Sequence, residues 1–105
     1  MNKVSIVIPM YYEEEVAREC YNRLKKVLDG LKNYQNEIIF VNDGSKDKTL
    51  EILTEIAKEN TNVKVISFAR NFGHQAAVTA GLKFVTGDVI LIIDADLQDP
   101  PELLP

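Results

Sequence analysis

The stretch Ile38-Ile39-Phe40-Val41-Asn42-Asp43-Gly44-Ser45 joins an apolar run to four residues that favour a turn. Four bulky apolar residues in succession are typical of a strand that is covered on both faces of a sheet. Asparagine, aspartate, glycine and serine favour the turn that follows. A helix is then predicted, with Ser45 or Asp47 as its N-cap, because apolar residues recur at helical spacing in Leu50, Ile52, Leu53, Ile56 and Ala57.

The same alternation of strand and helix extends over the rest of the chain. Strands are predicted at residues 4–8, 38–41, 63–68 and 89–93, and helices at residues 13–32, 50–57 and 73–85. Pro9 is expected to end the first strand, and a further helix is expected to begin near Pro100 or Pro101. This order predicts an α/β fold with a parallel, Rossmann-like sheet and right-handed crossovers. The small residues Ala76, Ala77, Ala80 and Gly81 predict a helix that packs closely on that sheet.

Length and composition limit the possible functions. The chain has 105 residues and a net charge of −4, which fits one soluble domain and argues against nucleic acid as the main partner. The sequence contains neither an apolar run long enough to span a membrane nor a signal-peptide pattern. A single cysteine, Cys20, excludes an internal disulfide and is expected in the core. We therefore expect a cytoplasmic protein, and the abrupt stop at Pro105 suggests a piece of a longer one.

Polar groups gather in the loops that follow the predicted strands. These loops are residues 9–13, 42–45, 69–74 and 94–99, whereas the opposite connections, residues 33–36 and 60–62, carry no comparable groups. Ligands of open α/β sheets bind beyond the carboxyl ends of the strands. The sequence therefore predicts a binding site at this edge of the sheet.

Asp94-Ala95-Asp96 gives the strongest indication of chemistry in these loops. Residues two apart in an extended segment point the same way, so both carboxylates can bind one cation, and Gln98 could add a neutral oxygen. Mg²⁺ or Mn²⁺ prefers such ligands and leaves positions open for substrate phosphates. The alternative is a turn with capping aspartates, including Asp99.

The other candidate residues each allow two interpretations. Asp43 could accept a hydrogen bond from a nucleotide base or could shape its own turn, and Glu13 could be functional or could favour a helix N-terminus. Tyr11 could stack on a base or cover the core, and Arg70 could lie near a phosphate or pair with an aspartate. His74 is expected to be a polar residue near a helix start.

Two common phosphate-binding patterns are absent from the sequence. There is no G-x-x-x-x-G-K-[ST] segment, and no G-x-G-x-x-G follows the first predicted strand. A diphosphate would then need another source of positive charge. A metal ion held by Asp94 and Asp96 would supply it.

Together these segments resemble glycosyltransferase family 2, a family of inverting enzymes with the A-type fold. The resemblance covers the whole chain and rests on residues 4–9, 41–47 and 94–96. Residues 68–75 and 94–102 are similar to the polyprenyl-phosphate sugar transferases, which include dolichol-phosphate mannose synthases and bactoprenol glucosyltransferases. The family often has asparagine before the first-loop glutamate, where this chain has Tyr12.

The resemblance implies that residues 1–105 form the nucleotide-sugar-binding half of the domain. The residues implied to line the donor pocket are Pro9, Tyr11, Glu13, Asp43, which would contact the base, and Arg70. Those implied to hold Mg²⁺ or Mn²⁺ on the donor diphosphate are Asp94, Asp96 and Gln98. The general base is expected beyond residue 105, so this chain alone is expected to be inactive.

The implied reaction is transfer of a sugar from a UDP- or GDP-sugar, with inversion, to a polyprenyl phosphate, or else to a glycan or lipid-linked hydroxyl. The alternatives are a non-catalytic nucleotide- or metal-binding module and a nucleotidyltransferase. The full-length protein is expected at the cytoplasmic face of the membrane, with membrane association only through later segments. In the family a further strand pairs beside residues 89–93, so the isolated chain is expected to self-associate at that edge.

Overall fold

The computed structural model describes residues 2–30 and 34–93. Strands and helices alternate in the predicted order: β1 (Asn2–Met10), α1 (Ala17–Asp29), β2 (Tyr34–Asn42), α2 (Thr49–Glu59), β3 (Val63–Ser67), α3 (His74–Leu82) and β4 (Val89–Ile92). The helix expected near Pro100 or Pro101 lies outside the described residues.

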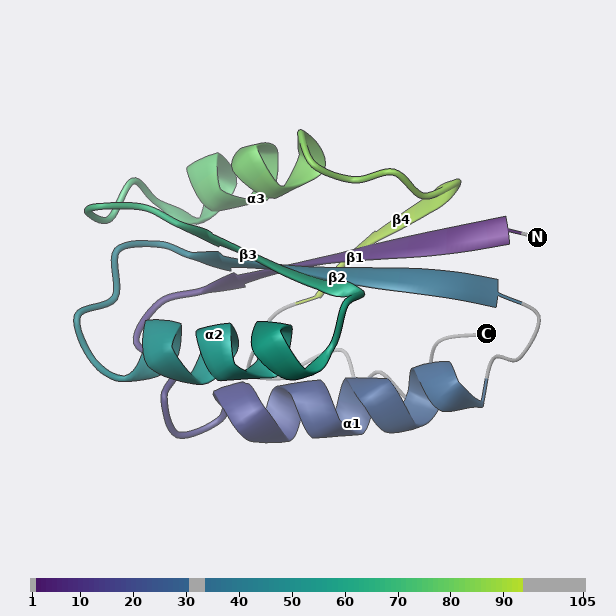
Figure 1. Cartoon of the computed structure of the whole chain (residues 1–105). Helices are drawn as coiled ribbons and strands as arrows, with labels where there is room; N and C mark the ends of the chain where they lie inside the picture. The colour runs from purple at the N-terminus through teal and green to yellow at the C-terminus, as the bar shows by residue number, and fades with distance from the viewer. Residues whose placement is uncertain (1, 31–33, 94–105) are drawn as a thin grey trace.

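The four strands form one parallel sheet in the order β3-β2-β1-β4. Ile6 at the centre of β1 is paired with Ile38 of β2 on one side and with Leu91 of β4 on the other. Because all strands run the same way, the loops after β1, β2 and β3 gather at one edge of the sheet (Figure 1). The predicted parallel α/β architecture is confirmed.

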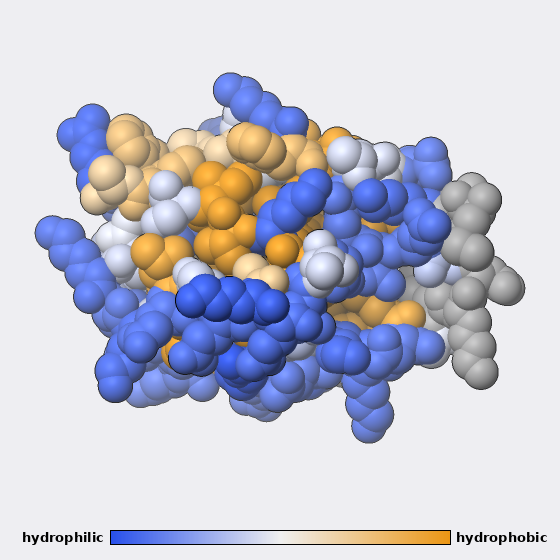
Figure 2. Space-filling view, in the orientation of Figure 1, coloured by the Kyte–Doolittle hydropathy of each residue, from blue (hydrophilic) through white to orange (hydrophobic). Residues whose placement is uncertain are grey.

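The helices cover both faces of the sheet, with α1 and α2 on one face and α3 on the other (Figure 1). The larger core cluster lies under α1 and α2 and includes Ile6, Ile8 and Phe40. The smaller cluster lies under α3 and is formed by Val7, Ile39, Val41 and Ala77. Successive strand residues therefore enter opposite cores, which explains the nearly continuous apolar runs. Hydrophilic residues cover the outer surfaces of α1 and α2 (Figure 2).

α3 approaches the sheet closely, as its small residues predict. Ala77 is fully buried, and a Cβ placed on Gly81 would lie 2.5 Å from Cγ1 of Val7. A larger residue at position 81 would therefore push the helix away from β1.

Pro9 does not end the first strand, which continues to Met10. The carbonyl of Val7 accepts the N–H of Ile93, so the backbone groups of residues 7 and 9 face β4. The last β1–β4 pair is Val7 with Ile92, so Pro9 lies just beyond it, where no described strand needs an N–H from β1.

Other predicted boundaries also shift. α1 begins at Ala17 rather than at Glu13, because residues 13–16 form a turn in which the carbonyl of Glu13 accepts the N–H groups of Val16 and Ala17. Cys20 is buried in the core as expected, and its burial raises the thiol pKa to about 12. Within the described part of the chain, no helix has the length and hydropathy needed to cross a bilayer.

Candidate functional site

Asp43 is a buried carboxylate at the carboxyl end of β2, and it binds the loop that joins β3 to α3. Its Oδ1 accepts the N–H of Phe72 at 2.8 Å. Its Oδ2 accepts the N–H of Gly73 at 3.0 Å and the side-chain amide of Asn71 at 3.0 Å. Asp43 thus fastens two loops together, a role that neither sequence interpretation included.

Asn42, rather than Asp43, shapes the turn after β2. Its Oδ1 accepts the N–H of Ser45 at 3.3 Å, and its Nδ2 donates to the Ser67 hydroxyl at 3.2 Å. The N-cap prediction for α2 was wrong for both Ser45 and Asp47, because the helix begins at Thr49 and its N-cap is Lys48. Asp47 comes nearer to that role, since it accepts the N–H of Thr49 at 2.9 Å.

Gly44 allows the loops after β2 and β3 to touch. Its φ is +78°, a conformation that favours glycine, and a Cβ at this position would collide with the backbone of Arg70 and Asn71. Contact between the two loops therefore requires a residue without a side chain at position 44.

The loop after β1 is attached to the loop after β2. The N–H of Tyr12 donates to the Ser45 hydroxyl at 2.7 Å, and the N–H of Glu13 donates to the Thr49 hydroxyl at 3.0 Å. The φ of Tyr12 is +53°, in the left-handed region that asparagine and glycine adopt more readily than tyrosine. The first three carboxyl-edge loops are therefore joined side by side.

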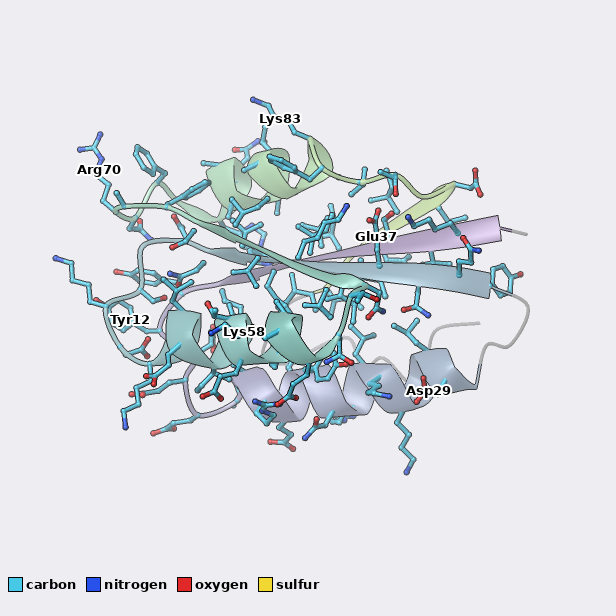
Figure 3. The ribbon with its side chains drawn as sticks, in the orientation of Figure 1. Tyr12, Asp29, Glu37, Lys58, Arg70 and Lys83 are labelled. Atoms are coloured by element: carbon cyan, nitrogen blue, oxygen red, sulfur yellow. The ribbon has the colours of Figure 1, made fainter. Side chains whose placement is uncertain are left out.

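Aromatic and cationic side chains form the rim of this edge. Tyr11 and Tyr12 are exposed and pack edge to face with ring centroids 4.7 Å apart. The Arg70 guanidinium lies 4.7 Å from the centroid of the exposed Phe72 ring, which in turn packs against Phe68. Figure 3 shows Tyr12 and Arg70 at the same end of the sheet.

Beside the first loop, the surface has an open depression of about 380 Å³. It is lined by residues 12–16 and Asp47, and most of its polar groups are carboxylates. A diphosphate would be repelled there, so this depression does not account for donor binding.

The structure places the predicted donor-pocket residues Pro9, Tyr11, Glu13, Asp43 and Arg70 at this edge. Pro9 is buried within β1, and Glu13 is partly buried in the first loop. His74 is the first residue of α3, as expected.

The predicted metal ligands Asp94, Asp96 and Gln98 lie outside the described residues. Asp94 follows Ile93, whose N–H donates to the Val7 carbonyl at 3.1 Å. The described chain therefore ends with Ile93 beside the carboxyl-terminal half of β1. Within residues 2–30 and 34–93, no group of three or more histidine, cysteine, aspartate or glutamate side chains could hold a metal ion.

Glu37 is a buried carboxylate toward the other end of the sheet (Figure 3), and it was not among the residues predicted to be functional. Burial disfavours its charged form, but hydrogen bonds from Ser5, Thr86 and Lys64 outweigh that effect and lower its pKa to about 2. The only sequence signal is an acidic residue directly before the apolar run of β2.

Comparison with known proteins agrees with this architecture. The chain is 57% identical over 101 residues to the uncharacterized glycosyltransferase YkcC of Bacillus subtilis (strain 168), covering 95% of this chain and 31% of that protein. It is 46% identical over 103 residues to the prophage bactoprenol glucosyl transferase homolog of Escherichia coli (strain K12), covering 98% of this chain and 33% of that protein. The chain thus spans about a third of the length of these relatives.

Two solved structures share the fold. The S. aureus TarS 1-349 structure with UDP-GlcNAc is 29% identical, with a TM-score of 0.74, over 90% of this chain and 26% of that one. The Pyrobaculum calidifontis mannosyltransferase PcManGT, in complex with GDP-Man and Mn²⁺, is 21% identical, with a TM-score of 0.78, over 90% of this chain and 28% of that one. The expected A-type glycosyltransferase fold is confirmed. Residues 5–105 match the family described as Glycosyl transferase family 2, and the chain belongs to that family.

Proposed function

We propose that the full-length protein transfers a hexose from a UDP- or GDP-sugar to a polyprenyl phosphate with inversion, and that residues 1–105 bind the donor. The observation that carries this proposal is the joining of three loops at the carboxyl edge, beside the end of the strand that leads to Asp94. Relatives named bactoprenol glucosyl transferase, 44–46% identical to this chain, favour a polyprenyl-phosphate acceptor.

Asp43 is proposed to contact the nucleotide base. A carboxylate has about four acceptor positions, and the β3–α3 loop occupies three of them. One position remains for an N–H of the base. The rim formed by Tyr11 and Arg70 would lie beside the bound nucleotide, with the aromatic ring available for stacking and the guanidinium for a phosphate.

Asp94 and Asp96, with Gln98, are proposed to hold Mg²⁺ or Mn²⁺, because two carboxylates and an amide oxygen are the hard donors that these ions prefer. The bound ion would neutralise charge on the donor diphosphate. A phosphate acceptor is already ionised and has little need of a general base, whereas a sugar hydroxyl would need one. We also propose that the protein acts at the cytoplasmic face of the membrane.

Calorimetry on the full-length protein tests this function against a panel of UDP- and GDP-sugars, with Mn²⁺ and with EDTA. We expect one donor class to bind only with the metal, and Asp96→Asn to weaken binding strongly in Mn²⁺ and little in EDTA. Equal binding by Asp96→Asn and wild type in saturating Mn²⁺ would contradict the metal assignment. Donor binding without sugar transfer to a polyprenyl phosphate would favour the non-catalytic module.

A further inference from the structure

Both oxygens of the buried Glu37 carboxylate are engaged. Oε2 accepts the Ser5 hydroxyl at 2.5 Å, the N–H of Thr86 at 2.6 Å and the Thr86 hydroxyl at 3.0 Å. Oε1 accepts the ammonium group of Lys64 at 3.2 Å and lies 3.7 Å from that of Lys3. Glu37 thus joins β1, β2 and β3 to the segment that leads into β4.

Ser5 extends these contacts to the next residue of that segment. Its hydroxyl donates to Glu37 and accepts the N–H of Gly87 at 2.8 Å. A Cβ on Gly87 would collide with the Ser5 side chain, so this glycine lies directly against β1. Thr86 and Gly87 are therefore held by a carboxylate and a hydroxyl that are themselves fixed in neighbouring strands.

The other contacts that fix the start of β4 along β1 come from Lys3, whose N–H and carbonyl bind Asp88 and whose ammonium group donates to the Thr86 hydroxyl at 2.6 Å. β4 pairs with β1 alone among the described strands, and Val89, Ile90 and Ile92 are 43–49% exposed. The buried Ile93 and the partly buried Leu91 exclude a one-residue slip, which would turn them toward the other face. They do not exclude a two-residue slip, which preserves the faces but moves the strand by about 6.6 Å.

We propose that Glu37, through Ser5, Thr86 and Gly87, is a positioning residue that sets where β4 begins and thereby how far along β1 its last residues, up to Ile93, extend. Asp94 follows Ile93 directly in the sequence, and Asp96 comes two residues later. The importance of that placement rests on the proposed function, in which these aspartates hold the metal. From Gly87 to Ile93 the distance along an extended strand is about 20 Å, so Glu37 acts through the strand and not by contact. The lysines beside Oε1 balance its charge.

The test compares Glu37→Gln and the milder Ser5→Ala with a matched control, Leu53→Ala. Leu53 is fully buried in α2 and makes none of the Glu37 hydrogen bonds, so its truncation lowers general stability. In the full-length protein without metal, we expect Glu37→Gln and Ser5→Ala to speed amide exchange in β4 relative to β3. Leu53→Ala should not change this ratio.

The second readout is the Mn²⁺ concentration for half-maximal nucleotide-sugar binding. We expect Glu37→Gln to raise it about tenfold, the scale on which metal affinity falls when ligands lose their support. Without metal, the affinity of Glu37→Gln for the matching nucleoside monophosphate should stay within about twofold of the wild-type affinity. Ser5→Ala should change both readouts in the same direction and by less.

Equal acceleration of exchange in β3 and β4, or an unchanged Mn²⁺ requirement in a folded Glu37→Gln protein that binds donor, would overturn the proposal. If Glu37→Gln does not fold, Ser5→Ala decides by the same two readouts. If wild type shows no metal-dependent donor binding, the proposed function fails. The β4-to-β3 exchange ratio then still decides whether Glu37 positions the strand.

Discussion

The Asp43 carboxylate lies 3.0 Å from the backbone N–H of Gly73, although the two residues belong to loops that follow different strands. Phe72 N–H and the Asn71 side chain donate to the same carboxylate. The loop bearing Arg70 is therefore held by a residue that is itself a candidate for base recognition. If Asp43 contacts the base as proposed, the order of this loop and nucleotide binding depend on the same carboxylate.

Asp43→Asn is expected to lower the free energy of unfolding by about 2–3 kcal/mol, because its amide NH₂ would face a buried N–H donor instead of accepting from it. Urea unfolding measures the loss. Asp47→Asn is the matched control, since that side chain lies near the surface and keeps an oxygen for the N–H of Thr49. An equal loss in the two variants would contradict the role of Asp43 in fastening the loops.

Gly44→Ala should destabilise the protein more than Gly73→Ala. Both glycines have positive φ, at +78° and +101°, so both substitutions carry backbone strain. Only at Gly44 would the added methyl group collide with another loop, whereas nothing lies within 4 Å of a Cβ at Gly73. We expect a difference of about 2 kcal/mol between the variants in thermal or urea unfolding. Similar losses would mean that the loops separate at little cost.

The order of elements could be predicted from sequence because it depends on local patterns. The apolar runs around Ile6 and Ile39 identified the strands, and the polar residues after them marked the edge at which three loops meet. Pro9 was misjudged because its effect depends on where β4 stops pairing, and the sequence does not record that.

The specific contacts of the site could not be predicted in the same way. Asp43 and its donors are 28–30 residues apart, and their meeting depends on how the β3–α3 connection lies across the β2–α2 turn. Glu37 looked like an ordinary polar residue before an apolar run. Its importance arises from Thr86, 49 residues away, which only the pairing of β1 with β4 brings near.

Tyr12→Asn is expected to stabilise the protein by about 1 kcal/mol, because asparagine tolerates the left-handed φ of +53° better than tyrosine. Tyr11→Asn provides the control. It removes the same ring contact from an equally exposed neighbour, but at ordinary φ. We therefore expect the melting temperature to rise for Tyr12→Asn and not for Tyr11→Asn. The opposite order would show that the contacts of the Tyr12 ring stabilise the protein by more than the backbone strain destabilises it.

Acidic pH should lower the free energy of unfolding, in part because Glu37 becomes protonated. Its pKa in the folded state is about 2, below the ordinary value of 4.5, so its ionised form stabilises the fold above about pH 4.5. This contribution is lost as the pH falls from 4.5 toward 2. In urea unfolding, the stability difference between wild type and Glu37→Gln should therefore shrink over that interval. Glu55→Gln, on the exposed side of α2, is the control and should show no such change. A constant difference between wild type and Glu37→Gln would exclude this titration.

A chain of residues 1–105 is expected to self-associate through β4. This strand lies at the end of the sheet order, and its exposed residues Val89, Ile90 and Ile92 are all apolar. The opposite edge strand, β3, carries the polar residues Lys64 and Ser67, which discourage pairing. Sedimentation velocity at micromolar concentration should show a dimer or larger species. Ile90→Lys should reduce the amount of this associated species, while Ser67→Lys on β3 should not. A monomeric wild-type chain would contradict the prediction, and loss of association only in Ser67→Lys would place the contact on β3.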